Sequence, residues 1–194
     1  MTQNTSILFI VATFIVIIFI LLLINNRKES ASSQMTAILK PYIVDEIKAI
    51  IVPDGIGGLL EIEHLILMEH GLLLVETYPM SGNMFGAETI DKWTQLINGR
   101  SYKFANPLRH IRTSRQALMV LAPNIPIFCR VIFNADSIFP KGKPEEVSVL
   151  SSLSDDLSNI QSSTIKMDQS SLAWQQIIRI ARKDGQAVQR DGEV

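Results

Sequence analysis

The sequence predicts one α/β domain, built of layered helices and strands, behind an N-terminal transmembrane helix. The transmembrane helix is indicated by the uncharged run Ile7–Ile24. The runs Leu65–Leu67 and Leu72–Val75 are apolar on both faces, which is typical of strands covered on both sides. Apolar residues at near-helical spacing from Leu108 to Leu121, followed by the apolar strand-like run Ile127–Phe133, supply the helix and strand that complete such a layer.

Composition limits the function classes but does not select one. The 194 residues are 47% hydrophobic and 19% charged, which excludes a disordered chain and is enough for one domain with a core and an appendage. A formal net charge of −1 gives no global signal for nucleic acid, so such binding must come from a local patch. The single Cys129 lies in an apolar run, and we expect a buried core thiol in a reducing compartment.

The N-terminal apolar run predicts an uncleaved single-pass anchor, residues 1–26. At about 1.5 Å per residue it is long enough for a hydrocarbon core about 30 Å thick. A signal peptide usually has a basic start and a shorter apolar stretch, whereas the first six residues here carry no basic side chain. Arg27 and Lys28 follow the span, which predicts that the downstream domain lies in the cytoplasm.

Residues 27–41 read as a polar tether and a first helix that stops before Pro41. The predicted domain, residues 42–155, opens with a strand over Tyr42–Val52 that ends in the turn sequence PDGIGG, where Asp54 is a turn residue. Gly71 then joins two apolar runs as a β-hairpin, because glycine takes the backbone angles that a tight turn needs.

After the hairpin we expect a loop over 79–88, a short helix over Thr89–Ile97 carrying Trp93, and a second loop over 98–107. The helix Leu108–Leu121 and the strand Ile127–Phe133 follow, so the expected order is helix, three strands, helix, strand. A short strand begins at 147. The last segment, residues 156–194, is Ser-rich and ends in an amphipathic helix, Leu172–Arg182.

Glu63 and Glu76 stand beside apolar runs, although a buried, unpaired carboxylate is costly. If the hairpin closes Met68 against Gly71, Glu63 lies opposite Glu76, and two facing negative charges are destabilising unless a divalent cation lies between them. If the loop has an odd number of residues, Glu63 lies opposite Thr77 and Glu76 turns to the other face. The first register is favoured, and solvation of the carboxylates at the sheet end is the alternative to a metal site.

Five ordered segments resemble the NERD (nuclease-related domain) family, a branch of the PD-(D/E)XK nuclease superfamily. They are LEIEHLIL, GLLLVETYPMSGNMFG, Trp93, the helix opening Asn106-Pro107-Leu108, and PIFCRVIFNADSIF. The resemblance covers about Tyr42 to Leu153. It implies a restriction-endonuclease-like core, a mixed sheet flanked by helices, and a metal-dependent nuclease acting on DNA or RNA.

On this resemblance, Glu63 and Glu76 are the catalytic carboxylates that hold Mg²⁺ or Mn²⁺. Tyr78 stands at the catalytic position where the motif has a lysine, and a phenol with a pKa near 10 supplies only a neutral hydrogen bond there. A basic group from another element would have to replace that lysine, and the candidates are Lys92, Arg100 and Lys103. The family tends to have Gln two residues after the Asn-Pro-Leu segment, where this chain has His110.

A basic stripe is the other chemical signal. Arg109, Arg112 and Arg115 recur every third residue along the helix, which suits phosphate binding or an ordinary solvated face equally well. The sequence therefore leaves two functions open: a membrane-anchored nuclease, or a catalytically degenerate nuclease-fold module that binds nucleic acid or protein at the membrane.

Overall fold

The computed structural model describes residues 14–21, 31–123, 125–160 and 167–183. These fall into two units that divide between Ile38 and Leu39. Residues 14–21 and 31–39 are helical, and a 3-10 turn, Lys40–Tyr42, ends the second helix at the expected proline. No helix within the described ranges is both long and apolar enough to cross a membrane. The predicted span Ile7–Ile24 lies mostly outside those ranges.

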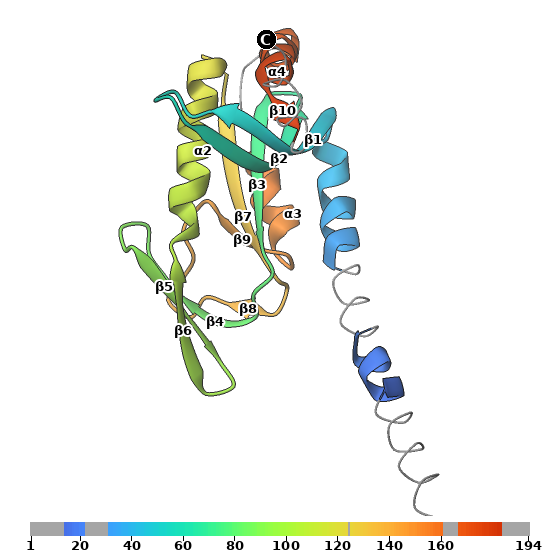
Figure 1. The fold of residues 1–194 in the computed structure, drawn as a ribbon, viewed down its shortest axis with the longest axis vertical. Coiled ribbons are helices and arrows are strands. Elements are labelled where there is room, and N and C mark those ends of the chain that lie inside the picture. The colour runs from blue at the N-terminus through green and yellow to red at the C-terminus, as the bar shows by residue number, and fades with distance from the viewer. Residues whose placement is uncertain (1–13, 22–30, 124, 161–166, 184–194) are drawn as a thin grey trace, which may run out of the picture. The chain divides into compact units, whose positions relative to one another are not determined.

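In the described residues, six strands form the main sheet in the order β10-β1-β2-β3-β7-β9 (Figure 1). The strands β1 to β3 are antiparallel, and β7 and β9 continue the sheet in parallel, so the sheet is mixed as predicted. The bounds are β1 (Asp45–Pro53), β2 (Leu59–Met68), β3 (Gly71–Tyr78), β7 (Ile127–Phe133), β9 (Val147–Val149) and β10 (Arg182–Lys183).

Helices cover both faces of this sheet because its central strands are apolar on both faces. Cys129 of β7 contacts Ile111 of helix α2 (Pro107–Leu121), while its neighbour Arg130 reaches Asp156 of helix α3 (Leu153–Ser158). Successive strand residues point to opposite faces, so α2 and α3 lie on opposite sides. Helix α4 (Met167–Ile180) packs beside α2. The prediction of a doubly covered sheet is confirmed.

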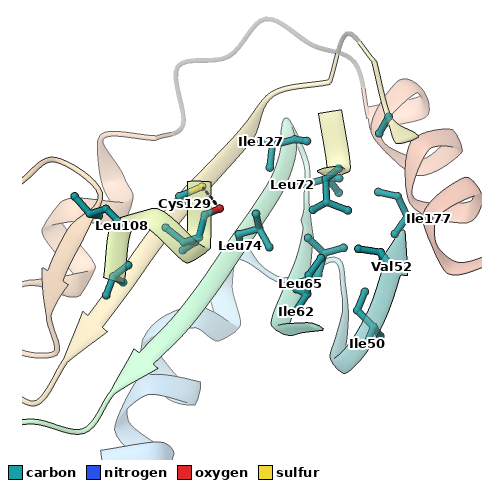
Figure 2. Packing of buried hydrophobic residues seen from close by; sticks show 14 of the residues in the cluster. Ile50, Val52, Ile62, Leu65, Leu72, Leu74, Leu108, Ile127, Cys129 and Ile177 are labelled. Carbon is teal, nitrogen blue, oxygen red and sulfur yellow. Dashed lines mark hydrogen bonds between the residues drawn. The ribbon is translucent and has the colours of Figure 1, made fainter. Parts of the chain in front are cut away.

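The larger core lies between the sheet and helices α2 and α4 (Figure 2). Helix α2 begins where predicted, because the Asn106 side chain accepts a hydrogen bond from Leu108 N at 2.9 Å and Pro107 occupies the first helical turn. The residues that fill this core come from every layer and include Ile50, Val52, Ile62, Leu65, Leu72, Leu74, Leu108, Ile127, Cys129 and Ile177.

A second sheet corrects the prediction for residues 79–107. Its four strands within the described residues run in the order β6-β5-β4-β8 and are β4 (Gly82–Phe85), β5 (Lys92–Ile97), β6 (Arg100–Ala105) and β8 (Ser137–Ile138). The expected helix over Thr89–Ile97 is wrong, and so are the flanking loops. Asn98 and Gly99 have φ of 51° and 72°, a two-residue turn with both angles positive that pairs β5 with β6 as a hairpin.

Candidate active site

The β2–β3 hairpin brings the two glutamates to neighbouring positions on adjacent strands. Met68 pairs with Gly71 and His64 pairs with Val75, which is the even-loop register. Gly71 has φ of +149°, and a Cβ there would lie 2.5 Å from Pro126 O, so the turn position requires glycine. This register continues toward Glu63 and Glu76 at the open end of the hairpin.

The pairing of β1 with β2 is interrupted at Glu63, although the register is the same on both sides of it. Lys48 pairs with His64 and Ile50 pairs with Ile62, while Ala49 between them has φ of +52°. At this point the alternation of side chains between the two faces of β2 is broken. Ile62 and Leu65 both enter the core, although residues three positions apart on a regular strand point to opposite faces. As a result Glu63 is exposed, in contrast to the buried residues that flank it.

Thr77 holds the Glu63 carboxylate. Glu63 Oε2 accepts a hydrogen bond from Thr77 N at 2.9 Å, and Glu63 Oε1 accepts one from Thr77 Oγ1 at 2.5 Å. Because Thr77 directly follows Glu76, these two bonds tie the Glu63 carboxylate to the residue next to Glu76. The Thr77 side chain itself points to the opposite face of β3 from Glu76. A carboxylate has about four lone-pair sites, so both Glu63 oxygens still have acceptor capacity.

Glu76 is buried, with 6% of its surface exposed, and its partner is His110 of α2. His110 Nδ1 lies 2.5 Å from Glu76 Oε1. Burial raises the pKa of the Glu76 carboxyl, the hydrogen bond and charge of His110 oppose that rise, and the negative charge of Glu63 adds to it.

Tyr78 supplies no positive charge to this site. It is half-buried, and its ring stacks on Phe133 with 5.6 Å between ring centroids. Burial raises the pKa of the Tyr78 phenol, and the charges of Glu76 and then Glu63 raise it further. A phenol with its ordinary pKa near 10 is already neutral at pH 7, and these effects favour the neutral form further.

The three predicted replacements for the motif lysine belong to the second sheet, Lys92 on β5 and Arg100 and Lys103 on β6. Within the described part of the chain, none of them forms a hydrogen bond or ion pair with Glu63 or Glu76. The basic side chain that reaches Glu76 is His110. In the sequence this residue stands out only because the family tends to have glutamine at its position. Its position two residues after Asn106-Pro107-Leu108 was the available signal.

The donor set suits a divalent cation that takes two protein ligands. Mg²⁺ prefers oxygen ligands and commonly binds through one or two carboxylates, with water and phosphate oxygens at its other positions. Glu63 and Glu76 would provide those carboxylates, and a cation there would offset both the burial that raises the Glu76 pKa and the smaller effect of the Glu63 charge. No group of three or more His, Cys, Asp or Glu residues suited to a metal occurs among the described residues.

The predicted arginine stripe is largely neutralised by carboxylates of the same chain. Arg109 pairs with Asp91. Arg112 donates from Nε to both Glu146 oxygens, at 2.9 and 3.1 Å, and from Nη2 to Glu88 at 2.9 Å. Of the three arginines, Arg115 is the one with no hydrogen bond or ion pair to the described residues. The stripe therefore offers less free positive charge than its sequence indicates.

Other sequence interpretations are confirmed as structural features. Asp54 Oδ1 accepts hydrogen bonds from Ile56 N and Gly58 N, at 2.9 and 2.8 Å, so Asp54 closes a turn. Cys129 is buried, and burial raises the pKa of its thiol to about 12. A buried, protonated thiol of this kind is not a nucleophile.

A mixed sheet covered by helices on both faces fits the core of a nuclease-like α/β domain. The nuclease-related domain family, NERD, matches residues 26–134, which is more than half of the chain. The chain belongs to the NERD family. No curated protein and no solved structure gives a significant match.

Proposed function

We propose that this chain is a membrane-anchored NERD protein whose domain hydrolyses DNA or RNA phosphodiesters in the cytoplasm with a divalent cation, Mg²⁺ or Mn²⁺. The observation that carries the proposal is the arrangement of Glu63 and Glu76. Glu63 is hydrogen-bonded to the residue that follows Glu76, and its charge adds to the rise in the Glu76 pKa that burial causes. Two carboxylates at the positions of the family's nuclease motif can both serve as ligands of one divalent cation, which would compensate their negative charges.

The residues of the chain then have distinct roles. A bound cation would stabilise the charge that develops on the phosphate and lower the pKa of an attacking water. Thr77 fixes the Glu63 carboxylate through two hydrogen bonds, and His110 fixes the Glu76 carboxylate through one. Tyr78 offers the site a neutral hydroxyl donor at the position of the family's lysine, so electrostatic help from that position is weaker than in the usual motif.

The anchor and the cytoplasmic location rest on the sequence. The uncharged run Ile7–Ile24 has the length of a single span, and Arg27 and Lys28 follow it on the side expected to face the cytoplasm. Carbonate extraction should leave the full chain in the membrane pellet, and protease should cleave the domain only from the cytoplasmic side. Release by carbonate would remove the anchor from the proposal.

A cleavage assay with the full chain in detergent tests hydrolysis directly. Wild type should cut DNA or RNA with Mg²⁺ or Mn²⁺ and stop when the metal is chelated. Glu76→Gln should lose about 100-fold or more of the rate, because it removes one of two charged ligands. The matched control is Glu61→Gln, an exposed glutamate on the same strand as Glu63, which should retain activity. Equal activity in both variants would overturn the site assignment.

A second function, a non-catalytic module of the same fold, is favoured by Tyr78. Its ring is stacked on Phe133 and its phenol is neutral, so this position lacks the positive charge of the lysine in the family's motif. Titration calorimetry with Mn²⁺ separates the two functions. A nuclease should take up Mn²⁺ through Glu63 and Glu76 and lose this binding in Glu76→Gln. A chain that takes up no Mn²⁺ is a binding module.

A further inference from the structure

The β5–β6 hairpin, Lys92–Ala105, is a local concentration of positive charge in a chain whose formal net charge is −1. Its sequence, KWTQLINGRSYKFA, contains Lys92, Arg100 and Lys103 and no Asp or Glu. All three basic residues are exposed. Figure 1 shows the hairpin extending past the end of the main sheet.

These three cations are free, in contrast to Arg109 and Arg112 of the predicted stripe. Neither Lys92, Arg100 nor Lys103 forms a hydrogen bond or an ion pair with any described residue. Surface cations that are not used within their own chain are available to an external anion, and their clustering on one element raises the local potential.

The hairpin is held rigidly at its base. Trp93 is fully buried, stacks on Phe133 with 6.3 Å between ring centroids, and contacts the Phe104 ring of the partner strand at 6.2 Å. Trp93 Nε1 donates to Ala87 O at 3.1 Å, and Gln95 Nε2 donates to Ser81 O at 2.8 Å. The charges are thus carried by a fixed β-ribbon whose base is anchored in the core.

The exposed side chains lie on both faces of the ribbon. Thr94 pairs with Lys103, so these two share one face. Gln95 pairs with Tyr102 and Ile97 pairs with Arg100, and these pairs lie on the opposite face, where Tyr102 is 48% exposed. A partner that contacts both faces at once fits this distribution better than a flat anionic surface, which would meet only one face.

We propose that the β5–β6 hairpin enters the major groove of duplex DNA, with Lys92, Arg100 and Lys103 contacting the phosphates on either side. The major groove is about 12 Å wide and admits a two-stranded ribbon, whose strands lie about 4.8 Å apart. Phosphates flank the groove on both walls, which matches cations on both faces of the ribbon. This inference rests on the proposed function, because it names duplex DNA as the nucleic acid that the domain engages.

The ribbon is joined to the candidate active site through the start of α2. β6 ends at Ala105, Asn106 caps the helix, and His110 lies in its first turns. Asn106 Nδ2 also donates to the carbonyls of Glu88 and Ile90, at 3.1 and 2.8 Å, and Arg109 pairs with Asp91 just before β5. Contacts on the ribbon would therefore position DNA relative to helix α2, whose His110 is hydrogen-bonded to Glu76.

Fluorescence anisotropy with the full chain in neutral detergent tests the inference. The probe is a short labelled duplex DNA, with EDTA present so that no cleavage occurs. The triple variant Lys92→Gln/Arg100→Gln/Lys103→Gln should bind at least about tenfold more weakly, and its salt slope should fall by about 0.9 for each phosphate that the variant no longer neutralises. The control Lys40→Gln/Lys141→Gln/Arg179→Gln changes the net charge equally at exposed sites elsewhere and should bind as wild type does.

Two further arms make the result specific. A duplex RNA of the same sequence has a deep, narrow major groove that does not admit the ribbon, so the triple variant should affect RNA binding much less. Equal losses for both duplexes, or equal losses in the control variant, would overturn groove insertion. A wild-type chain that binds DNA through the ribbon but never cleaves it with Mg²⁺ or Mn²⁺ present would end the proposed hydrolysis and leave this inference standing.

Discussion

His110 Nδ1 and Glu76 Oε1 lie 2.5 Å apart, so the first turns of α2 are tied to the carboxyl end of β3. Glu76 is buried, while the His110 side chain is 49% exposed. A buried carboxylate with a single charge-assisted hydrogen bond depends on that bond, because nothing else among the described side chains donates to it. This pair links the stability of the domain to the geometry of its candidate site.

Replacing His110 should therefore destabilise the fold through Glu76. We expect His110→Ala to lower the free energy of unfolding by about 1 to 3 kcal/mol at neutral pH, because it leaves the buried carboxylate unpaired. His110→Gln, which restores the family's residue, keeps a donor and should cost less. Urea denaturation of the two variants, and of His110→Ala combined with Glu76→Gln, measures the coupling. Additive effects in the double variant would show that the two side chains act independently.

Tyr78→Lys should increase cleavage if the domain is a metal-dependent nuclease. The substitution restores a positive charge beside Glu76, where one preorganised charge is worth about tenfold or more in rate, on the order of the effect of an oxyanion-hole donor. It also removes the ring that stacks on Phe133, so stability should fall by about 0.5 to 1.5 kcal/mol.

The control for this substitution is Tyr78→Phe, which keeps the stacked ring and removes only the hydroxyl. It should match wild type in stability and should not gain cleavage. Rates from a gel-based assay on both variants separate added charge from changed packing. No gain in Tyr78→Lys, in protein shown to be folded, would favour the non-catalytic module.

The sequence is sufficient for the central hairpin and for α2 because their signals are local. Gly71 between two apolar runs specifies the turn, and Asn106-Pro107 specifies the helix start. The β5–β6 hairpin was missed because Trp93 is its one fully buried residue, so its apolar pattern is weak. The Asn98-Gly99 dipeptide was the signal that should have outweighed that pattern.

The candidate site could be predicted only in part for a different reason. Glu63 and Glu76 belong to one hairpin, so spacing and resemblance are enough to bring them together. The His110–Glu76 bond joins residues 34 positions apart, and the Arg112–Glu146 pair spans the same separation. Such pairs depend on how α2 packs against the sheet, and a sequence pattern carries no information on that.

Asp156 should make stability depend on pH in the acid range. Burial alone would raise the pKa of its carboxyl, but the hydrogen bonds from Lys143 and Ser152 and the charge of Lys143 outweigh burial and lower it. A carboxyl with a lowered pKa stabilises the fold above its unfolded pKa of about 3.9, and the contribution is lost as pH falls through the folded pKa.

The expected result for Asp156→Asn is a loss of about 1 to 2 kcal/mol at neutral pH, since Lys143 Nζ loses its charged acceptor at 2.7 Å. The difference from wild type should shrink toward zero as pH falls through the folded pKa of Asp156, below which the carboxyl is protonated in both the folded and the unfolded chain. Urea titrations at several pH values follow this trend. A difference that stays constant with pH would mean that the substitution acts through packing and not through charge.

Gly86 and Trp93 are packed so closely that neither tolerates a change in size alone. A Cβ at Gly86 would overlap the indole ring of Trp93, which is fully buried. Gly86→Ala should therefore cost about 1 to 3 kcal/mol through overpacking, and Trp93→Leu should cost a similar amount or more through the space it leaves. In the double variant, the methyl group added at Gly86 occupies part of the space that Trp93 leaves. Its loss of stability should therefore be smaller than the sum of the two single losses, by about 0.5 kcal/mol or more. Simple additivity in thermal or urea unfolding would show that the base of the hairpin shifts to accommodate the methyl. The contact between Gly86 and Trp93 would then no longer be evidence that the base of the β5–β6 hairpin is rigid.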